Sequence, residues 1–159
     1  MAAGAATPSI RLTVPGTLAH RGVAVRVVAE ACRLVSGHGQ PPPVEVDRGY
    51  DLRHPFDAAV VSAFAEIFNN IVIHAYGAGA AGSIELAIAT SADDVVIDIH
   101  DHGAPFDLAA VPSPELDALP EGGMGIHIAR TMLDDVAYAP GPPNRWRLSK
   151  ALRPPEVTP

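Results

Sequence analysis

The chain has 159 residues, of which 48% are hydrophobic and 18% are charged. This length allows one domain with a substantial core, and the composition is that of a folded chain rather than a disordered one. The formal net charge of −7 argues against a general nucleic-acid-binding protein, which would need a basic surface. The single cysteine, Cys32, excludes an intrachain disulfide and a multi-cysteine metal cluster.

Targeting signals are not evident in the sequence. No apolar run approaches the ~20 residues that a membrane-spanning helix needs. The first eight residues lack the basic region and apolar stretch of a signal peptide. We therefore expect a cytoplasmic protein without a membrane partner, with one domain over residues 9–152 and disordered tails at 1–8 and 153–159.

The first part of the domain predicts a strand followed by a helix. Apolar and polar residues alternate over 10–14, as in a half-buried strand. Apolar residues then recur at helical spacing over 17–35, which predicts a helix. The proline run at 41–43 cannot be helical and is expected to form a stiff connector.

The second half predicts four strands, a long loop and a short helix. Residues 104–121 contain four prolines without a clear period, so they are expected to form a functional or mobile loop. A helix is expected from the glycines at 122–125 to about residue 133. Strands are expected over 83–90, 95–100, 135–139 and 145–152. This element order predicts an α+β fold, a two-layer α/β sandwich in which helices cover one face of a mixed sheet.

A helix expected over 55–76 is apolar around most of its circumference and carries one polar stripe. A buried helix must direct such a stripe toward something polar, and this stripe lacks the Lys and Arg typical of a solvated face. The stripe spans a sector of roughly 140° at the spacing of an α-helix, and its members are Ser62, Glu66, Asn69, Asn70 and His74.

Glu66 and Asn70 are four residues apart, so their side chains are neighbours on this helix. A carboxylate beside an amide oxygen can hold a hydrated Mg²⁺ and orient a nucleophile at the same place. His74 continues the stripe one turn later, where a lone histidine more often packs or caps than catalyses.

Two further segments carry residue types suited to a nucleotide. Asp101 ends a predicted strand and Gly103 follows, so the backbone can approach a flat ligand while the carboxylate accepts from an exocyclic amine such as that of adenine. A plain Asp-x-Gly turn is the alternative. The glycines of 122–125 open a helix, where backbone N–H groups attract phosphate, although such helix starts are common. No P-loop sequence is present.

In their order and spacing, these segments resemble the anti-sigma-factor serine kinases, a family of the GHKL (histidine-kinase-like) ATPase superfamily. The resemblance covers about residues 9–152. The motifs that carry it are Glu66-Ile-Phe-Asn-Asn70 with Ile73-His-Ala-Tyr76, Asp101-His-Gly103-Ala-Pro-Phe-Asp107, Gly122-Gly-Met-Gly125-Ile-His-Ile-Ala-Arg130, and the closing strands at 134–138 and 144–150.

The resemblance implies a role for each polar residue of a site that binds ATP and Mg²⁺. Asn70 would bind the Mg²⁺ that bridges the ATP phosphates. Glu66 would be the general base, or would orient the attacking hydroxyl. Asp101 would bind the adenine amino group.

The resemblance also implies roles for the glycines and the loop. Gly103 would make room for the adenine, and Gly123 and Gly125 would contact the phosphates at the helix start. Residues 104–121 would form the ATP lid, although this lid carries acidic residues and no Lys or Arg. The family often has a Thr just before the last strand that supports the adenine site, whereas here Pro143-Asn144-Arg145 stands in that place.

The family phosphorylates a serine on an anti-anti-sigma protein of the STAS type and sequesters a sigma factor, and its members are often homodimers. A non-catalytic nucleotide-binding module that regulates a partner by sequestration is the main alternative. The catalytic half of a histidine kinase lacks support, because residues 1–54 are too short and too broken by prolines for a phosphoacceptor hairpin. A metal hydrolase built on His100 and His102 lacks an evident third ligand.

Overall fold

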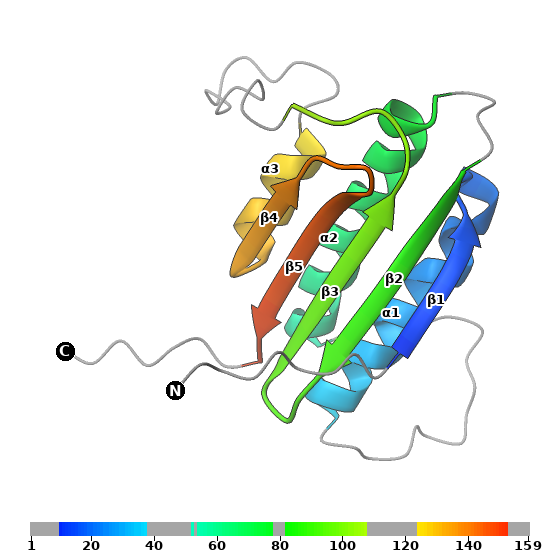
Figure 1. The fold of residues 1–159 in the computed structure, drawn as a ribbon. Coiled ribbons are helices and arrows are strands. Elements are labelled where there is room, and N and C mark those ends of the chain that lie inside the picture. The colour runs from blue at the N-terminus through cyan, green and yellow to red at the C-terminus, as the bar shows by residue number, and fades with distance from the viewer. Residues whose placement is uncertain (1–9, 38–51, 53, 78–81, 108–123, 153–159) are drawn as a thin grey trace, which may run out of the picture.

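The computed structural model describes residues 10–37, 52, 54–77, 82–107 and 124–152. Within these residues, three α-helices cover one face of a five-stranded sheet with the strand order β1-β2-β3-β5-β4 (Figure 1). The strands are β1 (Ile10–Pro15), β2 (Ser83–Thr90), β3 (Asp94–Asp101), β4 (Asp135–Ala139) and β5 (Asn144–Ala151). The helices are α1 (Arg21–Ser36), α2 (Pro55–Asn70) and α3 (Met124–Met132), with a 3₁₀ turn η1 (Leu18–His20) and a π-helical turn η2 (Ile71–Ala75).

The predicted α+β two-layer fold is confirmed, but the sheet is not mixed. All four strand pairings among the described residues are antiparallel. The reason lies in the last hairpin. β4 runs parallel to β3, but β5 turns back and inserts between them, so each strand of this half meets only antiparallel neighbours. The strand predictions are otherwise right to within one residue at most ends.

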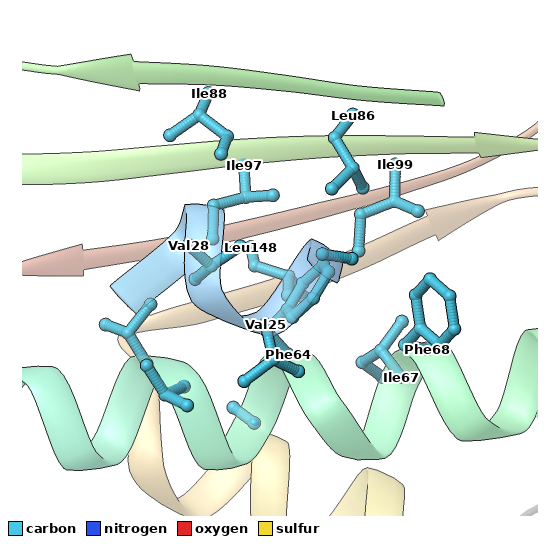
Figure 2. Close-up of a cluster of buried hydrophobic side chains, with 14 of the residues drawn as sticks. Val25, Val28, Phe64, Ile67, Phe68, Leu86, Ile88, Ile97, Ile99 and Leu148 are labelled. Atoms are coloured by element: carbon cyan, nitrogen blue, oxygen red, sulfur yellow. The ribbon is translucent and has the colours of Figure 1, made fainter. Parts of the chain in front are cut away.

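The core lies between the inner face of the sheet and the helices. Alternate residues of β2, β3 and β5 point inward and are buried, which is the period-2 pattern expected of a sheet with one covered face. Figure 2 shows strand residues such as Leu86, Ile97 and Ile99 facing Phe64 and Ile67 of α2. α2 lies between α1 and α3 (Figure 1), which explains why it is apolar around most of its circumference.

Contrary to the expectation from the sequence, one segment, Pro55–Ala75, is long and apolar enough by composition to cross a membrane. Half of its most apolar window is buried inside the domain. Its place as the central core helix accounts for that hydropathy. The helix begins where Pro55 occupies the first turn and the His54 Nδ1 accepts from the Phe56 backbone N–H at 3.2 Å.

The helix expected over 55–76 changes its geometry after Asn70. Over Ile71–Ala75 it is a π-helix, and the Tyr76 backbone N–H bonds to the Ile71 carbonyl at 3.1 Å. Such wider turns are rare and occur frequently at functional sites. Here the wider turn carries His74 and Ala75 to the end of the sheet at which β3 ends and β5 begins (Figure 1).

Candidate functional site: a nucleotide-binding hollow

An open hollow of about 280 Å³ lies between the end of the central helix, the segment after β3 and the last hairpin. Both Asn70 and Asp101, predicted from separate motifs, line it. The lining residues are Asn70, Ile71, His74, Ala75, Asp101, Ala104, Pro105, Phe106, Tyr138 and Trp146.

Asp101 is held by one of its two carboxylate oxygens. The side chain is 1% exposed, and its Oδ1 accepts from the Gly103 backbone N–H at 3.0 Å and from Asn144 Nδ2 at 2.9 Å. Among the described residues Oδ2 accepts no hydrogen bond, although Asp101 lines the hollow. The carboxylate is therefore fixed in orientation and offers one acceptor to a bound molecule. An exocyclic amine fits this acceptor.

Asn144 fills the place where the resembling family often has a threonine. The side chain is 2% exposed and fully engaged in hydrogen bonds. Its Nδ2 donates to Asp101 Oδ1 and to the Gly103 carbonyl, both at 2.9 Å, and its Oδ1 accepts from the Gly141 backbone N–H at 2.9 Å. Asn144 thus ties together the end of β3, the segment after it and the turn before β5.

Gly103 is required by a close approach of two backbones. A Cβ on this residue would lie 2.5 Å from the Ala75 carbonyl oxygen, and the next residue, Ala104, donates its N–H to that oxygen at 2.8 Å. The resemblance gives Gly103 the role of making room for the adenine. In the structure, the space it leaves is taken by the π-helical turn, so this glycine sets the wall of the hollow.

Tyr76 also holds the segment after β3 in place, by hydrogen bonds to β2 and to His102. Its hydroxyl donates to the Ser83 carbonyl at 2.6 Å and accepts from the His102 backbone N–H at 2.9 Å. The ring lies against Gly16 and Gly82, where a Cβ would come within 2.6 Å and 2.1 Å of its atoms. Burial raises the pKa of Tyr76, and the charges of Asp101 and Glu85 raise it further, against the lowering effect of the bond from His102.

Three aromatic rings pack together beside the hollow. The ring centroids of Tyr138 and Trp146 are 4.5 Å apart, and Phe106 lies 6.2 Å and 5.9 Å from them. The Tyr138 hydroxyl also accepts from the Phe106 backbone N–H at 2.7 Å. All three residues line the hollow, so a flat ligand would meet an apolar, aromatic surface beside the Asp101 acceptor.

Glu66 and Gly125 lie directly against one another. A Cβ on Gly125 would be 2.6 Å from Glu66 Oε2, so the start of α3 packs on the carboxylate. In the described part of the chain, neither the Glu66 nor the Asn70 side chain makes a hydrogen bond. Gly123 and residues 108–121 lie outside the described residues, so the phosphate contact of Gly123 and most of the expected lid stay predictions.

The rest of the polar stripe has other partners. Asn69 faces α1, where its Oδ1 accepts from Arg21 Nη1 at 3.1 Å. His74 is exposed and lines the hollow. His100, considered as a metal ligand, lies on the uncovered face of the sheet and accepts from Arg145 Nε at 3.0 Å through Nε2. The described residues contain no cluster of three or more His, Cys, Asp or Glu that could hold a metal ion.

Sequence reasoning missed Tyr76, Tyr138, Trp146 and the role of Asn144. The sequence placed Tyr76 at the end of a helix and in the motif Ile73-His-Ala-Tyr76, but gave its hydroxyl no role. For Asn144 a signal existed, because it shares the inward parity of Trp146 and Leu148 along β5. A polar side chain at a buried position of a strand must find partners, and the nearest candidates on the adjacent strand included Asp101.

Comparison with known proteins shows which family the chain matches. The model of the family described as histidine kinase-like ATPase domain matches residues 46–149, more than half of the chain. The serine-protein kinases RsbW of Oceanobacillus iheyensis and Bacillus licheniformis are 32% and 33% identical to the chain over 82 residues. These matches cover 46% of this chain and 52% and 51% of those proteins, so the chain spans about half the length of the curated relatives it matches.

Among solved structures, the histidine kinase domain of the blue-light activated histidine kinase from Erythrobacter litoralis EL346 matches with a TM-score of 0.49 and 18% identity. That match covers 83% of this chain and 61% of the other.

Proposed function

Because the chain belongs to the histidine kinase-like ATPase domain family, we propose that it binds Mg²⁺ and ATP in the hollow and phosphorylates a serine of a partner protein. The observation that carries this proposal is the placement of Asp101 and Asn70 on one hollow. Asp101 offers a fixed acceptor for the adenine amino group, and Asn70, which lines the same hollow, offers an amide oxygen. The aromatic residues beside Asp101 fit the flat face of a base.

The phosphate end follows from the contact between α2 and α3. Asn70 would be the protein ligand of Mg²⁺, which otherwise keeps waters and takes phosphate oxygens. When bound, the metal neutralises charge on the transferring phosphoryl group. Gly125 lies in the first turn of α3, whose N-terminal end favours negative charge. Glu66 touches this turn and would accept or orient the proton of the attacking hydroxyl.

For the substrate we propose an anti-anti-sigma protein of the STAS type, and for the regulated partner a sigma factor or another regulatory protein that the chain sequesters. We also propose that it acts as a homodimer in the cytoplasm, without nucleic-acid or membrane partners. The support for this finer assignment is the order of the motifs in the sequence and the naming of two relatives as serine-protein kinases.

A second candidate function is a nucleotide-binding module without phosphoryl transfer. One observation favours it. Within the described residues no side chain hydrogen-bonds to Glu66, so nothing there orients the carboxylate as a base. In that case nucleotide binding would change the affinity for a partner without chemistry.

Two measurements test these functions together. Calorimetry with ATP and Mg²⁺ should detect binding, and labelled ATP with a STAS-domain protein should yield a phosphoserine. Binding without transfer to any STAS protein tested would favour the module. The absence of binding up to millimolar ATP would contradict both candidates.

A further inference from the structure

The Asp101–Asn144 pair has a consequence for which purine the hollow accepts. The two residues are directly paired across β3 and β5, and their side chains are among the few buried polar groups of the described residues. Their side chains are joined by a 2.9 Å hydrogen bond. The Asn144 amide has an NH₂ group that donates and an oxygen that accepts, whereas the Asp101 carboxylate can only accept.

The orientation of the Asn144 amide is determined by its surroundings. Both N–H bonds of Nδ2 are used, one toward Asp101 Oδ1 and one toward the Gly103 carbonyl. The amide oxygen receives the Gly141 N–H. If the amide were flipped, its oxygen would face two acceptors and its NH₂ group would face a donor, so the observed orientation is the only one that satisfies the network.

Asp101 Oδ1 therefore faces two fixed donors, the Gly103 N–H and Asn144 Nδ2. Whatever side chain stands at position 101 must present an acceptor to them. For a planar carboxylate or amide, the second terminal atom is then turned toward the hollow. In the wild-type protein that atom is an oxygen, which accepts from an amine and repels a carbonyl.

We propose that Asn144 is a positioning residue that sets the purine selectivity of the site. It fixes the side chain at position 101 so that a base with an amine at this edge is accepted and a base with an oxygen there is rejected. The proposal rests on the proposed function only in taking a purine nucleotide as the ligand of the hollow.

The sharpest consequence concerns Asp101→Asn. The two fixed donors should hold the Asn oxygen in the place of Oδ1, so the new NH₂ group faces the hollow. An acceptor becomes a donor without a change of shape. The variant should lose about tenfold or more in affinity for ATP, the equivalent of one charge-assisted hydrogen bond. Its affinity for inosine triphosphate, which carries an oxygen in place of the amine, should be unchanged or higher.

The role of Asn144 is tested by making Asp101→Asn both in the wild-type protein and in the Asn144→Ala variant. Calorimetry would measure the affinity ratio of ATP to inosine triphosphate, each with Mg²⁺, in the wild type, Asp101→Asn, Asn144→Ala and the double variant. Asn144→Ala should lower the preference for ATP severalfold. In the double variant the amide at 101 has lost one of its two orienting donors, so the ratio should return toward one. A purely structural role would lower both affinities together and leave the ratio unchanged.

Asp98→Asn is the matched control, since Asp98 lies on the same strand but on the uncovered face, paired with Arg147. Its ratio should equal that of the wild type. Melting curves verify folding, and if Asn144→Ala unfolds, Asn144→Thr replaces it. The Thr hydroxyl can donate to only one of the two acceptors. The affinity ratio of ATP to inosine triphosphate in Asn144→Thr should therefore lie between the ratio of the wild type and that of the double variant Asp101→Asn with Asn144→Thr.

The outcomes separate this proposal from the proposed function. A wild type that binds ATP and inosine triphosphate equally overturns the selectivity role while leaving the nucleotide site in place. If the affinity ratio of ATP to inosine triphosphate in the double variant is reversed as fully as in Asp101→Asn alone, the positioning role of Asn144 is overturned. A wild type that binds neither nucleotide contradicts the proposed function itself, and with it this inference.

Discussion

Where we propose that the base binds, around Asp101, the polar side chains are hydrogen-bonded within the protein. Where we propose that the phosphates bind, at Glu66 and Asn70, the side chains have no such bonds among the described residues; these two places are called the base end and the phosphate end below. Asp101, Asn144 and Tyr76 join β3, β5 and the central helix through hydrogen bonds of 2.6–3.0 Å. Glu66 and Asn70, one helical turn apart on α2, make no side-chain hydrogen bond within the described residues, although Glu66 touches α3.

The difference indicates a division of labour. The base end is formed by the protein alone, so recognition there costs little reorganisation when a ligand binds. The phosphate end holds polar groups whose partners would be the metal and the triphosphate. Changes at the phosphate end should therefore alter chemistry and metal-dependent binding while the fold persists, and changes at the base end should alter stability together with binding.

The largest effect is expected for Glu66→Gln. If the carboxylate accepts the proton of the attacking serine, its loss should slow phosphoryl transfer by about 10²–10⁴-fold. ATP affinity and melting temperature should stay near the wild-type values, because no described side chain is bonded to this carboxylate. Transfer to a STAS protein, measured beside ATP affinity, checks this. A wild-type rate would rule out Glu66 as the base.

Gly125→Ala should separate activity from stability. The new Cβ would lie 2.6 Å from Glu66 Oε2, so the carboxylate must move, and a misplacement of about 1 Å can cost on the order of 10² in rate. Alanine favours a helix over glycine by roughly 0.5–1 kcal/mol, so the melting temperature should hold or rise. Gly22→Ala on α1 is the control, since nothing lies within 4 Å of its Cβ position. An unchanged transfer rate in Gly125→Ala would show that Glu66 tolerates displacement.

Asn70→Ala should weaken binding of ATP with Mg²⁺ about tenfold, because an amide ligand to a charged group is lost. Binding of ADP without metal should change little. Asn69→Ala is the neighbouring control, since that amide bonds to Arg21 instead of lining the hollow. Calorimetry with both nucleotides distinguishes the cases, and equal losses for the two would indicate a damaged helix rather than a lost metal ligand.

The sequence was sufficient to predict the elements and the faces they present. Period-2 alternation located β2 and the inward side chains of β3, and the composition of the polar stripe singled out Glu66 and Asn70. The Asp-x-Gly pattern and the resemblance of the motifs predicted that Asp101 binds the base. That role stays a prediction, and the structure brings Asp101 to the same hollow as Asn70.

What could not be predicted depends on which surfaces meet. The inward position of Asn144 along β5 indicates that its side chain needs a buried partner, but the bond to Asp101 spans 43 positions and local spacing does not identify that partner. The expected mixed sheet was wrong because the alternation of a strand does not reveal which neighbour it pairs with. The π-helical turn was missed because the spacing of apolar and polar residues is similar whether each backbone N–H bonds to the carbonyl four or five residues earlier.

The smallest effect is expected for Tyr76→Phe, which tests the base end. The ring stays and keeps covering Gly16 and Gly82, so no cavity opens. The Ser83 carbonyl and the His102 N–H lose their partner, which should cost about 1–3 kcal/mol.

The pH dependence of this loss identifies the hydroxyl as its source. Burial raises the folded-state pKa of Tyr76 above its ordinary value of 10.0, so the native state keeps the proton at pH values where the unfolded chain releases it. The contribution of the hydroxyl to stability is thus complete below pH 10 and is lost as the pH rises toward the folded-state pKa. Urea unfolding of the two proteins at pH 8 and above pH 10 should show a difference in free energy that narrows with pH. If the difference in unfolding free energy between the two proteins stays constant with pH, the Tyr76 hydroxyl is not shielded from solvent by burial, and the base end is less well packed than its hydrogen bonds indicate.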